Sequence, residues 1–254
     1  MLPYKFPRRA IMARHANFQK IPLIPALLVT RNFEAFSLGL KTQNLFVMLL
    51  KVHPENPSSR QIQQIVSCLQ AGGIIIYPTD TVYGLGCDIF HQEAIARICR
   101  IKQIPIEKAQ FSFVCHDLSH LSDYARQIDN PLFRLLKNSL PGPYTFILPA
   151  SKQVPKMLKT KKDTVGIRVP DNLIARTIVK ELGHPILSTS LTDTYVEYYT
   201  DPEWIHEKFK KIVDIVVDGG PGGIELSTVI DCTDEIPRLI RQGKGVWQDW
   251  VSAE

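Results

Sequence analysis

A short apolar run in the first half of the chain leads directly into a stretch of small and hydroxyl-bearing residues. The run Ile74–Tyr77 is followed by the sequence PTDTVYGLG at residues 78–86. Glycines let a backbone approach a ligand closely, and hydroxyl groups offer hydrogen bonds without adding charge. This combination suits a small polar ligand, although the same residue types also build an ordinary turn-rich loop. The sequence of this stretch alone leaves both interpretations open.

An arginine stands in a stretch that is otherwise apolar. Arg168 lies within Gly166-Ile167-Arg168-Val169-Pro170, and a guanidinium is almost never buried without a partner. That partner is either a carboxylate of the protein or a carboxylate or phosphate of a ligand, to which Arg offers two parallel hydrogen bonds. Similar alternatives apply to Lys102, which is either a solvated charge or a ligand contact. Hydroxyl residues at strand ends have two possible roles as well, since they either contact a ligand or hydrogen-bond only to nearby backbone. These residues are Ser188, Thr189, Ser190, Ser227 and Thr228.

The cysteines do not suggest a disulfide framework or a zinc site. There are five of them, an odd number with no C-x-x-C pair, which is typical of reduced and mostly buried thiols. Cys115, His116 and His120 could meet at a metal if they shared a helix face. The apolar residues before Asp117 instead favour a strand that runs into a helix cap, so we expect no resident metal.

Helices and strands alternate from about residue 58 onward, which predicts one α/β domain built on a single sheet. The closely spaced last strands predict that part of this sheet is antiparallel. Expected helices follow caps at Ser58 or Ser59, Asn130, Asp171 and Asp201, with another over 93–102. Expected strands are 74–77, 111–115, 144–148, 164–169, 185–188, 212–217, 227–232 and 238–240.

The first 47 residues differ from the rest in both charge and pattern. They hold seven Lys or Arg and one Glu, a balance of +6 against +5 for the whole chain, so residues 48–254 carry −1. We expect this stretch to be an N-terminal extension outside the fold: a transit-like segment, a disordered arm or upstream sequence. The folded domain is then 48–254. The longest apolar run, Ile21–Val29, contains two prolines and is too short to span a membrane.

Taken in order, several motifs resemble those of the YrdC-like family of threonylcarbamoyl-AMP synthases, and the YciO branch in particular. They are PTDTVYGLG, a helix that ends in Lys102, PGPYTFIL, GIRVP, STS, STVID and Arg241-Gln242-Gly243. The resemblance covers about residues 50–245. It implies a single YrdC-like domain, a twisted mixed sheet flanked by helices, with a concave and positively lined cleft.

The resemblance also implies an activity and a set of residues for it. Family members condense L-threonine, bicarbonate and ATP into threonylcarbamoyl-AMP with release of pyrophosphate, a step toward the threonylcarbamoyl modification of an adenosine in tRNA. Mg²⁺ is expected with ATP, no covalent nucleophile is needed, and a cytoplasmic location is expected. Lys102 and Arg241 would stabilise the transition state. Threonine would contact Thr81, Tyr83, Arg168 and Ser227, and ATP would contact Lys102, Thr145, Ser190 and Arg241.

Two departures from the family pattern fall on the ATP side. Ile104 stands where main-branch members carry an arginine, and Thr192 stands where they carry an asparagine. These losses leave two alternatives to the synthase. One is a protein that binds tRNA or double-stranded RNA with little or no catalysis, which the charge of −1 on residues 48–254 disfavours. The other is a related reaction on another nucleotide or acyl substrate.

Overall fold

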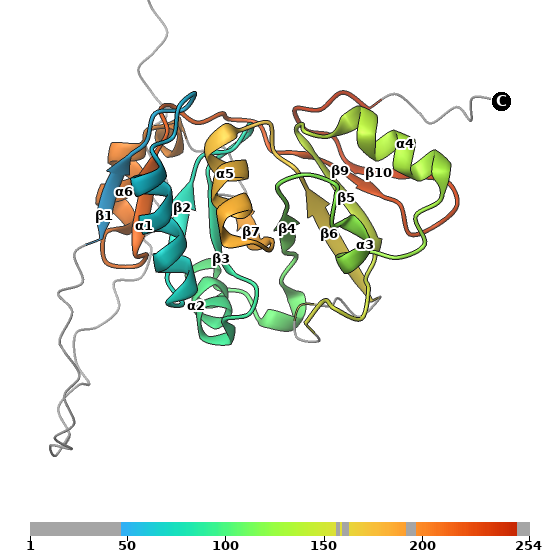
Figure 1. Cartoon of the computed structure of the whole chain (residues 1–254), viewed down its shortest axis with the longest axis horizontal. Helices are drawn as coiled ribbons and strands as arrows, with labels where there is room; N and C mark the ends of the chain where they lie inside the picture. The colour runs from blue at the N-terminus through green and yellow to red at the C-terminus, as the bar shows by residue number, and fades with distance from the viewer. Residues whose placement is uncertain (1–46, 156–157, 159–162, 192–196, 248–254) are drawn as a thin grey trace, which may run out of the picture. The chain divides into compact units, whose positions relative to one another are not determined.

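One mixed sheet connects the whole described part of the chain. The computed structural model describes residues 47–155, 158, 163–191 and 197–247. The expected N-terminal extension and Thr192 therefore lie outside the described residues. Within them the sheet has ten strands in the order β1-β8-β2-β3-β7-β4-β6-β5-β9-β10, and helices pack along it (Figure 1). This is the mixed α/β architecture that the alternating pattern predicts.

The strands are short, and parallel and antiparallel pairs alternate irregularly across the sheet. Pairs β1/β8, β2/β8, β4/β6 and β5/β9 are parallel, and the remaining five are antiparallel. The strands are β1 (Met48–Lys51), β2 (Ile74–Tyr77), β3 (Gly84–Asp88), β4 (Ser112–Val114), β5 (Tyr144–Pro149), β6 (Thr164–Arg168), β7 (Ile186–Ser190), β8 (Ile215–Asp218), β9 (Thr228–Asp231) and β10 (Arg238–Arg241).

None of the described helices is long and apolar enough to cross a membrane. They are α1 (Ser59–Gln70), α2 (Gln92–Lys102), α3 (Leu121–Tyr124), α4 (Asn130–Ser139), α5 (Leu173–Leu182) and α6 (Pro202–Phe209), with short 3₁₀ turns at Ile106–Lys108 and Glu197–Thr200. Three of the described helices, α4, α5 and α6, begin after a residue whose side chain caps them.

Both faces of the sheet are covered at β2, as the continuous apolar run of this strand predicts. Ile75 and Tyr77 pack into a core with the apolar faces of α1 and α5, which lie side by side in Figure 1. Ile74 and Ile76 face a second core on the other side, which includes residues of α2 and α6. All four residues of β2 are buried, so this strand contributes to the cores on both sides of the sheet.

Two predicted helix caps were wrong by one residue. Asp129, not Asn130, caps α4 by accepting a hydrogen bond from the backbone N–H of Leu132. Asn172, not Asp171, caps α5 by accepting from Ala175. In both cases the cap is the residue whose side chain reaches the third N–H of the helix, which sequence alone does not fix when two cap-forming residues are adjacent. The cap at Asp201 is confirmed.

Residues 78–86 are not a turn-rich loop throughout, because Gly84–Asp88 forms the strand β3. Its two glycines lie on the ring of Tyr77 in the neighbouring strand. A Cβ added at Gly86 would lie 2.9 Å from the carbonyl oxygen of Leu187 and 3.1 Å from the Tyr77 ring. Tyr77 is fully buried, its hydroxyl donates to Ser188 Oγ at 2.7 Å, and burial raises its pKa to about 12.

We expect Gly86→Ala to lower the free energy of unfolding by about 1–3 kcal/mol, the usual cost of overpacking a tight core. The Leu187 carbonyl is backbone and the Tyr77 ring is buried, so neither yields easily to the added methyl. Urea unfolding measures the loss. A change below about 0.5 kcal/mol, typical of an open surface position, would show that β3 is not packed against Tyr77 in this way.

Candidate functional site

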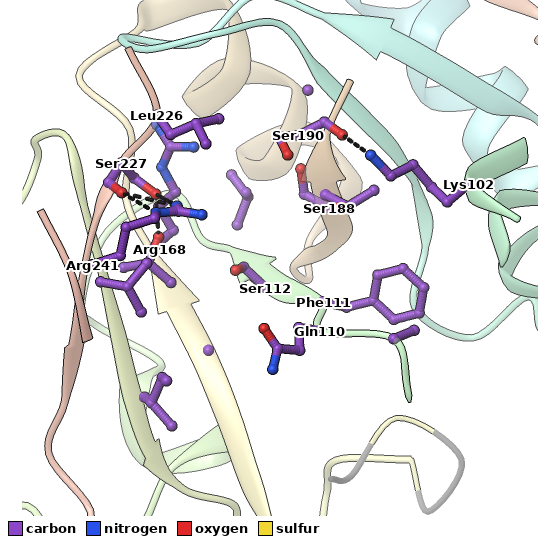
Figure 2. A pocket seen from close by; sticks show the side chains of 18 of the residues that line it. Lys102, Gln110, Phe111, Ser112, Arg168, Ser188, Ser190, Leu226, Ser227 and Arg241 are labelled. Atoms are coloured by element: carbon purple, nitrogen blue, oxygen red, sulfur yellow. Dashed lines mark hydrogen bonds between the residues drawn. The ribbon is translucent and has the colours of Figure 1, made fainter. Parts of the chain in front are cut away.

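The residues that the sequence singles out come together around one cavity of about 730 Å³. Seven of the eight predicted contacts line it: Thr81, Lys102, Thr145, Arg168, Ser190, Ser227 and Arg241. They come from strands and loops spread over more than half of the chain. The close view shows Arg168, Arg241 and Ser227 on one side of the cavity, with Lys102 and Ser190 on the opposite side (Figure 2).

The floor of the cavity is a row of aligned residues that crosses five strands. Ser188 of β7 pairs with Ser112 of β4, which pairs with Gly166 of β6, which pairs with Ile147 of β5, which pairs with Asp231 of β9. Paired residues of neighbouring strands project on the same face of a sheet, and all five line the cavity. Because three successive residues of the row are small, Ser188, Ser112 and Gly166, the sheet itself makes room for a ligand here.

Arg241 at the end of β10 is fixed to the start of β9. Its Nη2 and Nε donate to the carbonyl oxygen of Ser227 at 2.9 and 3.3 Å. The Ser227 hydroxyl in turn lies 2.9 Å from Thr145 Oγ1. These contacts orient the guanidinium at the cavity.

Lys102, the last residue of α2, reaches the cavity from the opposite side. Its Nζ donates to the carbonyl oxygen of Ser190 at 3.1 Å, and Gln103 behind it ends the helix in the left-handed conformation. Two cations on opposing walls of the cavity suit an anionic ligand that spans it. Figure 2 shows both of these contacts as dashed lines.

Arg168 at the end of β6 has a protein partner and also faces the cavity. Its Nη2 donates to Asp80 Oδ1 at 2.6 Å and to Thr81 Oγ1 at 2.7 Å. The two side chains are only 12% and 7% exposed. Asp80 Oδ2 and Arg168 Nε are buried and have no hydrogen-bond partner among the described residues. The internal ion pair considered for Arg168 therefore exists, and it leaves hydrogen-bonding capacity on both of its members.

Tyr83 is the predicted contact that the structure places elsewhere. Its side chain is fully buried and does not line the cavity formed by the described residues. The hydroxyl donates to the carbonyl oxygen of Gly220 at 2.7 Å, and a Cβ at Gly222 would lie 2.6 Å from the ring. Tyr83 thus packs the loop at residues 78–83 against the segment after β8 and supports the loop that carries Thr81.

Several lining residues had no individual signal in the sequence. Gln110, Phe111 and Ser112 line the cavity before and at the start of β4, and Lys108 lines it from the 3₁₀ turn. Asp231 does so from β9. A strand was predicted at 111–115, but which residues of it face a ligand follows only from pairing between strands distant in the chain.

Neither a metal centre nor a reactive thiol emerges from the described residues. They contain no group of three or more His, Cys, Asp or Glu that could hold a metal ion, and the cysteines among them are unpaired by disulfides. Burial raises the pKa of Cys68, Cys115 and Cys232 to about 12. A thiol with such a pKa is almost entirely protonated near neutral pH, so it is a poor nucleophile.

Comparison with known proteins relates this sequence and architecture to one family. The family model for Sua5, YciO and YrdC, described as telomere recombination, matches residues 67–243. The Escherichia coli protein YciO, itself uncharacterized, is 47% identical over 196 residues, which cover 76% of this chain and 94% of YciO. A threonylcarbamoyl-AMP synthase of Coxiella burnetii is 31% identical over 183 residues, which cover 71% of this chain and 98% of that enzyme.

Solved structures agree with the sequence comparison. The crystal structure of E. coli YciO superposes with a TM-score of 0.73 at 45% identity, covering 79% of this chain and 97% of YciO. The crystal structure of P. abyssi Sua5 complexed with L-threonine gives a TM-score of 0.70 at 29% identity, covering 78% of this chain and 58% of Sua5. The family match spans more than half of the sequence, and the mixed sheet is shared with both structures. This chain therefore belongs to the Sua5/YciO/YrdC family.

Proposed function

We propose that this protein condenses L-threonine, bicarbonate and ATP into threonylcarbamoyl-AMP, releasing pyrophosphate, in the pathway of tRNA threonylcarbamoyl modification. The observation that carries the proposal is the single cavity in which Arg168, Arg241 and Lys102 converge with the hydroxyls of Thr81, Thr145 and Ser227. Relatives named threonylcarbamoyl-AMP synthase and a relative solved with L-threonine support it. A volume of about 730 Å³ lies within the usual range for small-molecule sites.

Threonine would bind on the side of the cavity formed by Arg168. The guanidinium would donate to the threonine carboxylate, and Thr81, already hydrogen-bonded to Arg168, lies beside it. The Ser227 hydroxyl, which is held by a hydrogen bond with Thr145, would form a hydrogen bond with one of the remaining polar groups of the amino acid. Charge-assisted hydrogen bonds of this kind supply both affinity and orientation.

ATP would extend toward Lys102, Ser190, Thr145 and Arg241. Lys102 and Arg241 would neutralise charge that develops on the phosphates when the bond to pyrophosphate breaks. Mg²⁺ would enter as part of the nucleotide substrate, since it binds through phosphates with only one or two protein carboxylates. Two acidic residues, Glu107 and Asp231, line the cavity and would offer carboxylates to the Mg²⁺ ion.

The reaction needs positioning and electrostatics rather than a protein nucleophile. The threonine amine and bicarbonate form a carbamate with loss of water. A carbamate oxygen attacks the α-phosphorus, and the electron pair of the bond that breaks leaves with pyrophosphate. The chain's contribution is to hold the two reactants in line and to exclude water, which can lower a barrier substantially by itself. The eight hydroxyl-bearing and four cationic side chains that line the cavity agree with such a mechanism.

Position 104 offers a gain-of-function test of the ATP side. Ile104 lines the cavity and is half-buried, so a longer cationic side chain there would face the proposed phosphates. We expect Ile104→Arg to raise threonine-dependent pyrophosphate release by about tenfold, less than the 10²–10³ of an ideally placed donor, because its surroundings are not shaped to hold it.

Ile104→Met is the matched control, since it replaces the side chain by one of similar volume and no charge. Pyrophosphate release at saturating ATP is measured beside a melting curve for both variants. A stable Ile104→Arg variant with no gain over Ile104→Met would indicate that this part of the cavity does not hold the phosphates of ATP.

A further inference from the structure

A buried tyrosine contacts a residue of the cavity floor from two strands away. Tyr77 of β2 has no exposed surface and is not among the described residues that line the cavity. Its hydroxyl nevertheless donates to Oγ of Ser188 in β7 at 2.7 Å. The strand β3 lies between β2 and β7 in the sheet, so the Tyr77 side chain has to cross β3 to make this contact.

The two glycines of β3 make this crossing possible. Gly84 pairs with Tyr77, and Gly86 pairs with Ser188. A Cβ at Gly84 would lie 3.0 Å from the Tyr77 ring and 3.2 Å from Ser188 Oγ, and a Cβ at Gly86 would lie 3.1 Å from the ring. A side chain at either position would therefore crowd the tyrosine. The Gly-x-Gly sequence of β3 thus keeps the Tyr77 hydroxyl in contact with Ser188.

The direction of this hydrogen bond leaves the Ser188 hydroxyl with a proton to donate. Burial raises the pKa of Tyr77 to about 12, so the phenol keeps its proton near neutral pH and Ser188 Oγ accepts it. The Ser188 proton itself has no acceptor among the described residues. Ser188 is 6% exposed and lines the cavity. A ligand atom that accepts a hydrogen bond there would extend the chain that starts at Tyr77.

A second hydroxyl lies next to Ser188 on the cavity floor. Ser112 of β4 is the Cα partner of Ser188, and such antiparallel partners have Cβ atoms about 4.5–5.5 Å apart. The Ser112 hydroxyl has no hydrogen-bond partner within the described part of the chain. Gly166 on its other side leaves it open, since a Cβ there would lie 3.1 Å from Ser112 Oγ. Figure 2 shows both serines between the cationic side chains of the two opposing walls.

We propose that Ser188 and Ser112 bind oxygen atoms of bicarbonate and of the carbamate formed from it. The inference rests on the proposed function. In threonylcarbamoyl-AMP the carbamoyl group links the threonine nitrogen to the α-phosphate, so its subsite lies between threonine at Arg168 and the phosphates at Lys102. Hydroxyls can donate to a carboxylate oxygen there without adding a further cation to the cavity. Tyr77 is a positioning residue, because it acts only through Ser188.

The first test measures KM for each of the three substrates from threonine-dependent pyrophosphate release. Ser188→Ala should raise KM for bicarbonate at least about tenfold, the effect of losing one hydrogen bond to a charged acceptor, and Ser112→Ala should act in the same direction. KM for threonine and for ATP should change less than about threefold, since other side chains hold these substrates. Tyr77→Phe should raise KM for bicarbonate about threefold, because Ser188 stays but is no longer oriented.

Tyr124→Phe is the matched control for Tyr77→Phe. It removes the hydroxyl of another buried tyrosine, one that does not line the cavity of the described residues, and it should leave all three KM values unchanged. A structural role of the Tyr77 hydroxyl alone would not raise KM for bicarbonate selectively.

A second test measures binding and needs no turnover. N-carbamoyl-L-threonine carries a carbonyl group on the threonine nitrogen, where the carbamate would form, and L-threonine lacks it. In calorimetric titrations of the full chain, Ser188→Ala should weaken binding of N-carbamoyl-L-threonine at least about fivefold more than binding of L-threonine. Equal losses for the two ligands would overturn the inference.

The outcomes for the subsite and for the proposed function can be told apart. Formation of threonylcarbamoyl-AMP with a KM for bicarbonate that Ser188→Ala leaves unchanged overturns the subsite and leaves the function standing. A protein that releases no pyrophosphate, but whose Ser188→Ala variant loses affinity selectively for N-carbamoyl-L-threonine, contradicts the reaction and supports the subsite. A folded protein that binds neither ligand contradicts both.

Discussion

Arg168→Ala is expected to weaken L-threonine binding by about 2–4 kcal/mol, or roughly 30- to 1000-fold in Kd, while ATP binding changes little. Arg168 lines the cavity, and a guanidinium can grip a ligand carboxylate with two parallel hydrogen bonds. Calorimetric titration with each ligand separately measures both affinities.

The same substitution leaves Asp80 as a buried carboxylate without its cation, and it should therefore also lower the melting temperature. The double variant Asp80→Asn/Arg168→Ala separates the two effects. It removes the orphaned charge, so it should recover much of the stability while threonine binding stays lost. If affinity for both ligands falls equally in Arg168→Ala and both return in the double variant, then Arg168 serves only as a structural ion-pair partner.

Lys102→Met is expected to lower the rate of pyrophosphate release by about 10²–10³, the usual effect of removing one well-placed charged donor to a developing charge. Methionine keeps most of the length of the side chain and loses its charge. The hydrogen bond from Lys102 to the Ser190 carbonyl is partly exposed, so the loss in stability should be small.

Lys180→Met provides the matched control, because Lys180 is an exposed lysine on α5 that does not line the cavity of the described residues. It should leave the rate unchanged. Equal rates in the Lys102 and Lys180 variants, each with unaltered melting, would show that the α2 lysine is not part of the phosphate site.

The sequence predicted the outline of the fold because most of its elements follow local patterns. The apolar run of β2 and the i, i+3, i+4 spacing of α1 are visible in the chain itself, and both are confirmed. The strand β3 was missed because Gly84 and Gly86 have low strand propensity. What makes this segment a strand is packing against Tyr77 and pairing with β7, a partner about 100 residues away.

The site was predictable to a similar extent and for similar reasons. Residue types at the ends of strands and of one helix identified seven residues that line the cavity. Only the pairing of strands reveals that Ser112 and Gly166 form its floor. Arg168 had two alternative partners in the sequence, and the structure shows that Asp80 is bonded to it while the guanidinium still lines the cavity. Tyr83 could not be distinguished from a ligand contact, because its partner Gly220 is remote in the chain.

The most direct test of the proposed activity is to incubate the purified protein with MgATP, L-threonine and bicarbonate and to analyse the products by mass spectrometry. The account predicts threonylcarbamoyl-AMP and an equal amount of pyrophosphate, both dependent on threonine and bicarbonate and both strongly reduced in Lys102→Met. Absence of both products from a folded protein that binds ATP and threonine would contradict the account. Salt-sensitive binding of tRNA or double-stranded RNA without such turnover would point instead to an RNA-binding role.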